Sequence, residues 1–264
     1  MIYETIFLKD VSEVIKSNAK LTAICPKCYD DNEVDRKRPT IIVLPGGGYE
    51  FCSEGESEVV ALRFIKEDFN CFVLEYSVGN IVYPTPLDEV FAAILFIKEN
   101  AEKYRVDVNK ICVLGFSAGG HLASSIGAFY NDQYFLDYFN VSQEKLKIAG
   151  VLLSYPVITM YDPYTHVGTR DHITQHNPEL IRKFAIEKHI SASYPKTFIW
   201  TTANDDIVPS INSLLIVDQL IKYQVPVEFH LYPEGPHGLS ICKDGFNGVE
   251  TWVDHAIRFI KEKI

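Results

Sequence analysis

Gly115-Phe116-Ser117-Ala118-Gly119 is the stretch that decides the fold of this 264-residue chain. It follows the apolar run Ile111–Leu114 and leads into a helix-compatible run, residues 120–126. This order predicts a buried strand, a sharp turn and a helix, with the hydroxyl of Ser117 exposed at the tip of the turn. Small residues two before and two after the serine are needed because the backbone passes close to itself there. The N–H of Ala118 is expected to point to where an oxyanion would form.

Composition places the chain among ordinary globular proteins. Hydrophobic residues make up 47% and charged residues 23%, and the formal net charge is −10. This acidic balance disfavours nucleic acid and anionic membranes as partners. The first residues have no basic region followed by an apolar stretch, and no run approaches the roughly 18 apolar residues of a membrane-spanning helix. We therefore expect a cytoplasmic protein whose partner is a small molecule, with neither nucleic acid nor membrane; a homodimer is left open.

The six cysteines fit a reducing compartment. Cys71 and Cys112 lie in apolar, strand-like runs, which predicts small buried hydrophobic residues. Cys25-Pro26-Lys27-Cys28 is a C-x-x-C without a second pair. Two unrelated thiols near the end of a strand are the interpretation we favour over a zinc or redox site.

Short β-rich runs alternate with longer amphipathic runs, which predicts an α/β fold with a mostly parallel central sheet and helices on both faces. Strands are expected near residues 3–8, 20–25, 41–44, 71–76, 111–116, 148–153, 197–201 and 227–232. Helices are expected near residues 56–67, 85–104, 118–129, 210–223 and 248–262. The first strands have no helix between them, so they are expected to pair antiparallel. No linker or repeat is visible, so residues 1–264 are expected to form one domain.

Residues 155–195 break the alternation. About 40 residues pass without a strand-like run, and loops of this length in compact domains are usually functional. Asn177-Pro178-Glu179-Leu180 predicts the start of a short helix. We expect a small insertion over the carboxyl edge of the sheet. Its three histidines lack carboxylates at metal-ligand spacing, so no metal site is expected; they are His166, His172 and His176.

A serine nucleophile needs a base, and the base needs an orienting acid. Asp205 and Asp206 follow the expected strand that ends at Thr201, and loops past the carboxyl ends of strands are where α/β sheets place their active residues. We favour Asp205, with Asp206 interpreted as a solvated or turn-capping carboxylate. His237 lies between proline and glycine just after the last expected strand, which favours it as the base.

Pro45-Gly46-Gly47-Gly48-Tyr49 directly follows a buried strand. Its glycines let the backbone approach a substrate oxygen with free N–H groups. A phosphate site is disfavoured because neither G-x-x-x-x-G-K-[ST] nor a helix-opening G-x-G-x-x-G is present. A plain glycine-rich turn is the other interpretation. Tyr49 is expected to line a substrate pocket together with Phe116 and Tyr155, although a half-exposed loop aromatic is an equal alternative for Tyr49.

With its glycine loop, elbow, acid loop and histidine loop in this order, the chain resembles the α/β-hydrolases. More narrowly, it resembles the small acetyl-esterase and carboxylesterase group related to hormone-sensitive lipase, including sugar acetyl esterases. The matching stretches are residues 45–49, 115–123, 204–209 and 235–238. Two departures, Pro45 for a common histidine and Ser77 for a common arginine, concern the acyl-chain preference more than the mechanism.

The resemblance implies a role for each matching residue. Ser117 is the nucleophile, Asp205 the orienting acid and His237 the general base. The oxyanion hole is implied to consist of the N–H groups of Gly47, Gly48 and Ala118.

The function implied is hydrolysis of short-acyl, above all acetyl, esters through an acyl-enzyme, with sugars among the alcohols and no cofactor. Two alternatives stay open. One is a serine peptidase of the prolyl-oligopeptidase type, against which the missing gating domain argues. The other is a non-catalytic small-molecule binder with a hydrolase fold, which an intact triad disfavours.

Overall fold

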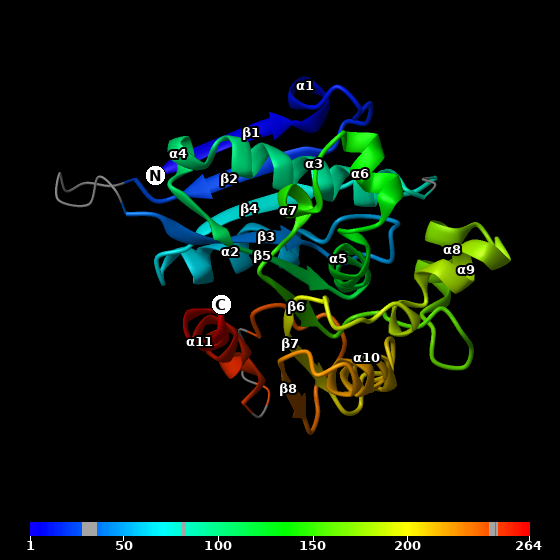
Figure 1. Cartoon of the computed structure of the whole chain (residues 1–264). Helices are drawn as coiled ribbons and strands as arrows, with labels where there is room; N and C mark the ends of the chain where they lie inside the picture. Colours follow the sequence, from blue (N-terminus) through cyan, green and yellow to red (C-terminus); the bar gives the residue numbers. More distant parts are fainter. Residues whose placement is uncertain (28–35, 81–82, 243–245, 247) are drawn as a thin grey trace.

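The computed structural model describes residues 1–27, 36–80, 83–242, 246 and 248–264, and these residues build an eight-stranded sheet (Figure 1). The strand order is β1-β2-β4-β3-β5-β6-β7-β8. The strands are β1 (Ile2–Phe7), β2 (Lys20–Cys25), β3 (Arg38–Leu44), β4 (Asn70–Glu75), β5 (Val106–Phe116), β6 (Gly150–Ser154), β7 (Lys196–Thr202) and β8 (Val227–Tyr232). β2 is antiparallel to β1 and to β4, and all other neighbours are parallel. The predicted fold class is confirmed, including the antiparallel first strands.

Helices cover both faces of this sheet (Figure 1). The α-helices are α1 (Leu8–Val11), α2 (Glu58–Ile65), α3 (Thr85–Glu99), α4 (Ala101–Tyr104), α5 (Ala118–Phe129), α6 (Gln133–Phe139), α7 (Gln143–Leu146), α8 (Val167–Thr174), α9 (Pro178–Phe184), α10 (Ile211–Lys222) and α11 (Trp252–Lys263). The 3-10 helices among the described residues are η2 (Glu54–Glu56), η3 (Ile186–Lys188) and η4 (Val249–Thr251). The sequence did not lead us to expect α6 and α7, and the helix expected over 85–104 is divided between α3 and α4.

The central strand β3 explains why the sheet is buried on both faces. Successive side chains of a strand point to opposite faces. Ile42 and Leu44 therefore join the apolar cluster formed with α3, α5 and α10, whereas Ile41 and Val43 join the cluster formed with α2 and α11. All four side chains are fully buried, as a continuous apolar run in a parallel sheet requires. The parallel strands consequently end at one shared edge, and their loops meet there.

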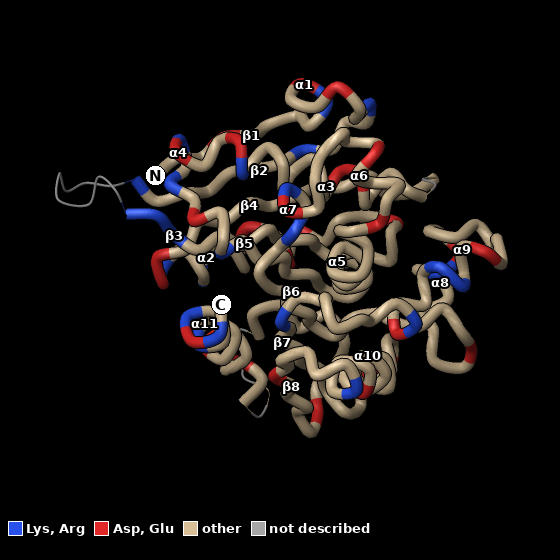
Figure 2. The backbone as a smooth tube through the Cα atoms, viewed as in Figure 1, with Lys and Arg blue, Asp and Glu red and all other residues tan. Residues whose placement is uncertain are grey.

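Charged residues of both signs are interspersed along the described backbone (Figure 2). Near the start of β3, for example, Arg38 pairs with Asp68, and close by Lys103 pairs with Glu4. Among the described helices, none combines the length and the apolar character that a bilayer crossing requires. The expectations about nucleic-acid and membrane partners stay predictions.

The described cysteines are free thiols. They are Cys25, Cys52, Cys71, Cys112 and Cys242. Cys71 and Cys112 are buried in the sheet, as predicted. Burial raises the pKa of Cys25 to about 12, so this thiol is protonated at neutral pH. Cys28, the second thiol of the C-x-x-C, lies outside the described residues, and the role of that pair stays a prediction.

Candidate active site

A sharp turn joins β5 to α5, and Ser117 is the single residue between them. Its backbone has φ 52° and ψ −116°, a conformation that costs non-glycine residues about 1–3 kcal/mol. A Cβ on Gly115 would lie 2.0 Å from the carbonyl oxygen of Gly119, and one on Gly119 would lie 2.2 Å from that of Leu44. Side chains at either position would therefore force the turn open. The small residues of the elbow are a steric requirement, as the sequence indicated.

Hydrogen bonds hold the strained backbone of Ser117 in place. Its N–H donates to the carbonyl of Ser154 at 3.0 Å, and its own carbonyl accepts from the N–H groups of Val157 and His121, each at 3.1 Å. The neighbouring strand and the new helix thus fix the position of the hydroxyl.

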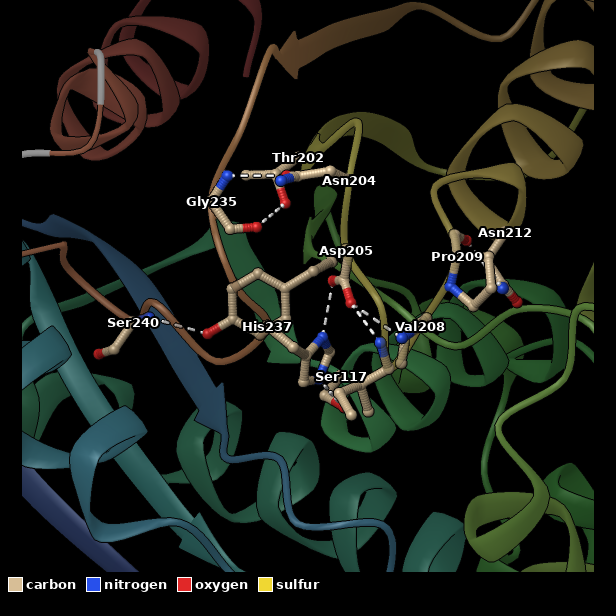
Figure 3. Close-up of polar contacts among 12 residues, drawn as sticks. Ser117, Thr202, Asn204, Asp205, Val208, Pro209, Asn212, Gly235, His237 and Ser240 are labelled. Carbon is tan, nitrogen blue, oxygen red and sulfur yellow. Dashed lines mark hydrogen bonds and ion pairs between the residues drawn. The ribbon is translucent and has the colours of Figure 1, made fainter.

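Ser117, His237 and Asp205 form one line of hydrogen bonds (Figure 3). Nε2 of His237 lies 2.8 Å from Oγ of Ser117, and Nδ1 lies 2.7 Å from Oδ2 of Asp205. Because a carboxylate only accepts hydrogen bonds, Nδ1 carries the proton and Nε2 presents its lone pair to the serine hydroxyl. The side chain of Asp205 is 1% exposed, whereas Asp206 is exposed to solvent. Of the two acids considered, the structure brings Asp205 to the histidine.

The second oxygen of Asp205 is also fixed. Oδ1 accepts from the N–H of Ile207 at 3.0 Å and from the N–H of Val208 at 2.9 Å. Both bonds hold the carboxylate from the side opposite its contact with His237. The acid therefore belongs to a hydrogen-bonded turn.

The loops that carry Asp205 and His237 are bonded directly to each other (Figure 3). The N–H of Gly235 donates to Oδ1 of Asn204 at 2.9 Å, and Oγ1 of Thr202 donates to the carbonyl of Gly235 at 2.8 Å. Gly235 has φ 153°, and a Cβ there would lie 2.8 Å from the side chain of Leu239. A glycine is therefore needed where the two loops touch. Bonds from the side chains of Asn204 and Thr202 to the backbone of Gly235 thus hold the acid loop beside the base loop.

The glycine loop lies beside the serine. Gly47 and Gly48 have φ 126° and 65°, and a Cβ on Gly47 would lie 2.0 Å from the carbonyl oxygen of Phe51. Both glycines and Ser117 line the same cavity. Within the described chain, the backbone N–H groups of Gly47, Gly48 and Ala118 have no hydrogen-bond partner. They are available to an oxyanion, and that role stays a prediction.

The cavity at Ser117 has a volume of about 370 Å³. Its walls come from the glycine loop, the segment that follows it, the histidine loop and α8 of the insertion. Figure 1 shows α8 and α9 on the side of the molecule toward which β3 and β5 point. The insertion thus lies over the carboxyl edge of the sheet, where the sequence placed it.

Three aromatic residues expected to line this cavity do not line it. Tyr49 and Phe116 are fully buried, and Tyr155 is 2% exposed. Strand alternation turns Phe116 toward α11, where its ring packs against Trp252 with 5.9 Å between centroids. The hydroxyl of Tyr49 contacts Nδ1 of His121 at 2.9 Å beneath the glycine loop. The structure thus does not place these three residues in the wall of the cavity, and their contact with a substrate stays an untested prediction.

Tyr155 instead supports the site from behind. Its ring packs edge-on against His237 at a centroid distance of 4.9 Å. Its hydroxyl donates to Oε1 of Glu56 at 2.6 Å and accepts from the N–H of Ser240 at 2.9 Å. Oε2 of Glu56 accepts from the N–H of Gly46 at 2.8 Å. These bonds connect the glycine loop to the histidine loop.

The buried acid of this network, Glu56, is a residue that the sequence reasoning missed. Burial raises its pKa, and the hydrogen bonds from Tyr155 and Gly46 oppose that rise. The only signal is an acidic residue in the polar stretch after the glycine loop, and that stretch also contains the exposed Glu54. The pattern alone does not separate the two acids.

His121 lies one helical turn after Ser117, and both of its ring nitrogens are hydrogen-bonded within the protein. Its Nε2 lies 3.0 Å from the carbonyl oxygen of Phe184, which can only accept, so Nε2 carries the proton. Nδ1 then accepts from the hydroxyl of Tyr49. Burial lowers the pKa of His121 to about 4. The neutral ring ties α5 to the glycine loop and to the insertion.

His166 and His172 are the other residues that the sequence reasoning did not assign to the site. Both line the cavity with Ser117. Residue type and spacing bear on metal binding. They do not predict whether a loop turns its side chains toward the cavity. The signal available was their presence in a long segment without strands.

Comparison with known proteins identifies relatives that match most of this chain. Residues 27–220 match the model of the BD-FAE family. Endo-1,4-beta-xylanase B of Butyrivibrio fibrisolvens is 34% identical over 236 residues, which cover 85% of this chain and 36% of the xylanase. The chain thus spans just over a third of the length of that relative.

Two solved structures match along nearly the full chain. An acetyl ester-xyloside bifunctional hydrolase from Caldicellulosiruptor lactoaceticus superposes with a TM-score of 0.85 at 32% identity, covering 98% of this chain and 95% of that one. The carboxylesterase Cest-2923 from Lactobacillus plantarum WCFS1 gives 0.86 at 27% identity, covering 99% and 98%. The resemblance to α/β-hydrolase esterases is confirmed.

Proposed function

The chain belongs to the BD-FAE family, and we propose that it is a serine carboxylesterase that removes acetyl groups from sugars through an acyl-enzyme on Ser117. The observation that carries the proposal is the line of hydrogen bonds from Asp205 through His237 to Oγ of Ser117, at 2.7 and 2.8 Å, ending at an open cavity. The named activities of the acetyl ester-xyloside hydrolase and the carboxylesterase support the substrate class.

The first half of the reaction acylates the enzyme. Nε2 of His237 takes the proton of Ser117 while Oγ attacks the ester carbonyl carbon. Asp205 holds the imidazole in orientation and stabilises its charged form. The N–H groups of Gly47, Gly48 and Ala118 bind the tetrahedral oxyanion, and each such donor is worth about 3–4 kcal/mol in other hydrolases. The alcohol then leaves with the proton from His237.

The second half releases the acid. His237 takes a proton from a water molecule, which attacks the acyl carbon, and the same backbone donors bind the second oxyanion. Collapse of this intermediate returns the proton to Ser117 and frees acetate. Every acid-base step thus uses one imidazole nitrogen.

The size of the cavity favours short acyl groups. At about 370 Å³ it lies near the lower end of ligand sites in proteins, which run from roughly 300 to 1,000 Å³. The insertion approaches the glycine loop closely, since a Cβ on Gly48 would lie 3.5 Å from Cε1 of His166. Acetyl fits this space, whereas a long acyl chain would need the insertion to move.

The test is Ser117→Ala, assayed with phenyl acetate. We expect kcat to fall by at least about 10⁴-fold, because the nucleophile is lost. Wild-type protein should form a fluorophosphonate adduct on Ser117, as seen by mass spectrometry. Ser193→Ala, at an exposed serine of the same chain, is the matched control and should retain activity. Unchanged turnover by Ser117→Ala would refute the proposal, and absence of the adduct would favour a non-catalytic binder.

We further propose that the chain works in the cytoplasm as an enzyme for a small ester. The five described cysteines support this location, because all are free thiols and four are buried. Fractionation of the source cells, with the chain followed by antibody, tests it, and recovery outside the cell would contradict it.

A further inference from the structure

Two histidines on the insertion side of the cavity each use one ring nitrogen for structure and leave the other free. Nδ1 of His166 accepts from the N–H of Thr169 at 3.2 Å and lies 2.8 Å from Oγ1 of the same residue. A nitrogen that accepts from a backbone N–H carries no proton, so the neutral ring of His166 carries its proton on Nε2. Burial lowers the pKa of His166, which keeps that ring neutral. Nε2–H is thus a hydrogen-bond donor.

His172 has the opposite arrangement. Its Nδ1 lies 3.0 Å from the carbonyl oxygen of Gly48. Because a carbonyl only accepts, Nδ1 carries the proton, and Nε2 of the neutral ring is an acceptor. The same contact fixes the ring against the glycine loop, beside the expected oxyanion donors.

Neither Nε2 atom has a hydrogen-bond partner among the residues that the structure describes. Both side chains line the cavity that contains Ser117 and His237. Both rings lie against Gly48, since a Cβ there would lie 3.5 Å from Cε1 of His166 and the carbonyl oxygen of Gly48 lies 3.0 Å from Nδ1 of His172. The cavity wall therefore presents one free donor and one free acceptor near the reacting atoms.

The acyl half of an acetyl ester cannot use these groups. Its carbonyl oxygen is met by the backbone N–H groups, and its methyl group is apolar. A sugar hydroxyl, in contrast, both donates and accepts. Hydroxyls on the carbons next to the ester would match a donor and an acceptor on the wall.

We propose that His166 and His172 select the alcohol half of the substrate, with Nε2–H of His166 donating to one free hydroxyl beside the ester and Nε2 of His172 accepting from another. This inference rests on the esterase function proposed above. A site with such groups discriminates against an analogue that lacks the hydroxyls, because its own polar atoms are then left unpaired. The free hydroxyls of the sugar, and not the acetyl group alone, would decide which ester is cleaved.

Two asparagine variants separate recognition from structure. In His166→Asn, Oδ1 can still accept from the N–H of Thr169 and cap α8. In His172→Asn, the amide N–H₂ can still donate to the carbonyl of Gly48. Both variants remove Nε2 from the cavity. His176→Asn is the matched control, because His176 belongs to the same insertion with its side chain 75% exposed.

The substrates are methyl 3-O-acetyl-xyloside, which has a free hydroxyl on each side of the ester, and its 2,4-dideoxy analogue, which has neither hydroxyl. The measured quantity is the ratio of kcat/KM for the sugar ester with free hydroxyls to that for the dideoxy analogue. We expect each asparagine variant to lower this ratio about tenfold, since one hydrogen bond to the substrate is lost. His176→Asn should keep the wild-type ratio.

The outcomes distinguish this inference from the function on which it rests. An unchanged ratio in both asparagine variants, or an equal loss of kcat/KM for both substrates, would overturn recognition by the histidines while leaving the esterase intact. Absence of any Ser117-dependent hydrolysis of phenyl acetate by wild-type protein would overturn the proposed function, and the inference with it. A ratio that falls only for His166→Asn or only for His172→Asn would overturn the role of the other residue.

Discussion

The elbow around Ser117 and the insertion at residues 155–195 meet at one cavity but are held in place by different means. At the elbow, backbone packs against backbone. Gly115 and Gly119 approach carbonyl oxygens so closely that a Cβ at either would lie 2.0–2.2 Å away from one. Only glycine fits at these two positions, and the backbone of the turn is fixed by this close packing.

In the insertion, side chains make further connections besides the backbone bond from the N–H of Val157 to Ser117. Asn212 of α10 is the clearest of these side chains. Its Oδ1 accepts from two N–H groups of the insertion, and its N–H₂ donates to the carbonyls of Tyr164 and Pro209. This buried amide uses all four of its hydrogen-bonding positions. The side chain of Asn212 thus hydrogen-bonds the first part of the insertion to α10.

This difference between the elbow and the insertion indicates where substitutions should affect catalysis and where they should affect stability or selectivity. A backbone held by close approach fixes the nucleophile, to which the base and the acid are hydrogen-bonded in line. A segment held by side chains can present other groups to the cavity without moving the triad. The comparison therefore predicts large losses of rate on the elbow side and smaller effects on stability or selectivity on the insertion side.

The largest effect is expected from Asp205→Asn. The amide cannot accept the Nδ1–H of His237 with a carboxylate's charge, and it favours the wrong tautomer of the ring. In other triads this change lowers kcat by about 10⁴-fold, and we expect a loss of that order with phenyl acetate. Asp206→Asn is the control, because Asp206 is exposed and should retain wild-type kcat. Equal losses in both variants would contradict the assignment of Asp205.

His121 is hydrogen-bonded to Tyr49 of the glycine loop and to Phe184 of the insertion. Protonation of its ring should therefore lower the free energy of unfolding. Burial lowers its pKa to about 4, from 6.5 in the unfolded chain. Above pH 6.5 the ring is neutral in both states and adds no pH dependence. Between pH 6.5 and 4 only the unfolded chain takes up the proton, so the free energy of unfolding falls as the pH falls. The expected loss from this one residue reaches about 3 kcal/mol near pH 4.

The measurement is urea unfolding at several pH values for wild type and His121→Gln, which cannot take up this proton. We expect the decrease between pH 6.5 and 4 to be smaller in the variant, whatever its absolute stability. Buried carboxyls with raised pKa, such as Asp88, act in both proteins and cancel in the difference. His176→Asn, at an exposed histidine, should keep the wild-type slope. Parallel slopes for wild type and His121→Gln would exclude the effect.

The sequence predicted the parts of this molecule that depend on local rules. Strand β2 and helix α5 were placed at their observed bounds, because a buried apolar run and an elbow followed by small residues are local patterns. Ser117, Asp205 and His237 were found because each follows a strand in a sheet whose carboxyl ends must meet.

The features that the sequence did not predict are the directions in which side chains of loop residues point. Tyr49 was expected in the cavity, yet its φ of 61° turns the ring under the glycine loop. Glu56 was missed because its partners, Gly46 and Tyr155, come from distant parts of the chain. Long-range hydrogen bonds of this kind leave no periodicity to recognise.

A smaller effect on kcat is expected from Glu56→Gln. This variant tests whether side-chain hydrogen bonds also support the loops around the elbow. The amide keeps one acceptor and turns an N–H₂ toward either Gly46 or Tyr155, both of which donate to Glu56. We expect kcat with phenyl acetate to fall about tenfold with little change in KM, since one supporting hydrogen bond is lost. Glu54→Gln, at an exposed neighbour, is the control. A rise in KM without loss of kcat would indicate that Glu56 contacts the substrate instead.

The smallest effect is expected in the insertion, from Asn177→Ala. Oδ1 of Asn177 accepts from the N–H of Glu179 at 2.8 Å and caps α9. Loss of such a cap costs about 1 kcal/mol, whereas Asn177→Asp keeps an acceptor and should stay close to wild type in urea unfolding. Because α9 contributes no side chain to the cavity, kcat with phenyl acetate should not change in either variant. A tenfold loss of kcat in Asn177→Ala would show that the insertion and the triad move together, and the contrast between the two regions would not hold.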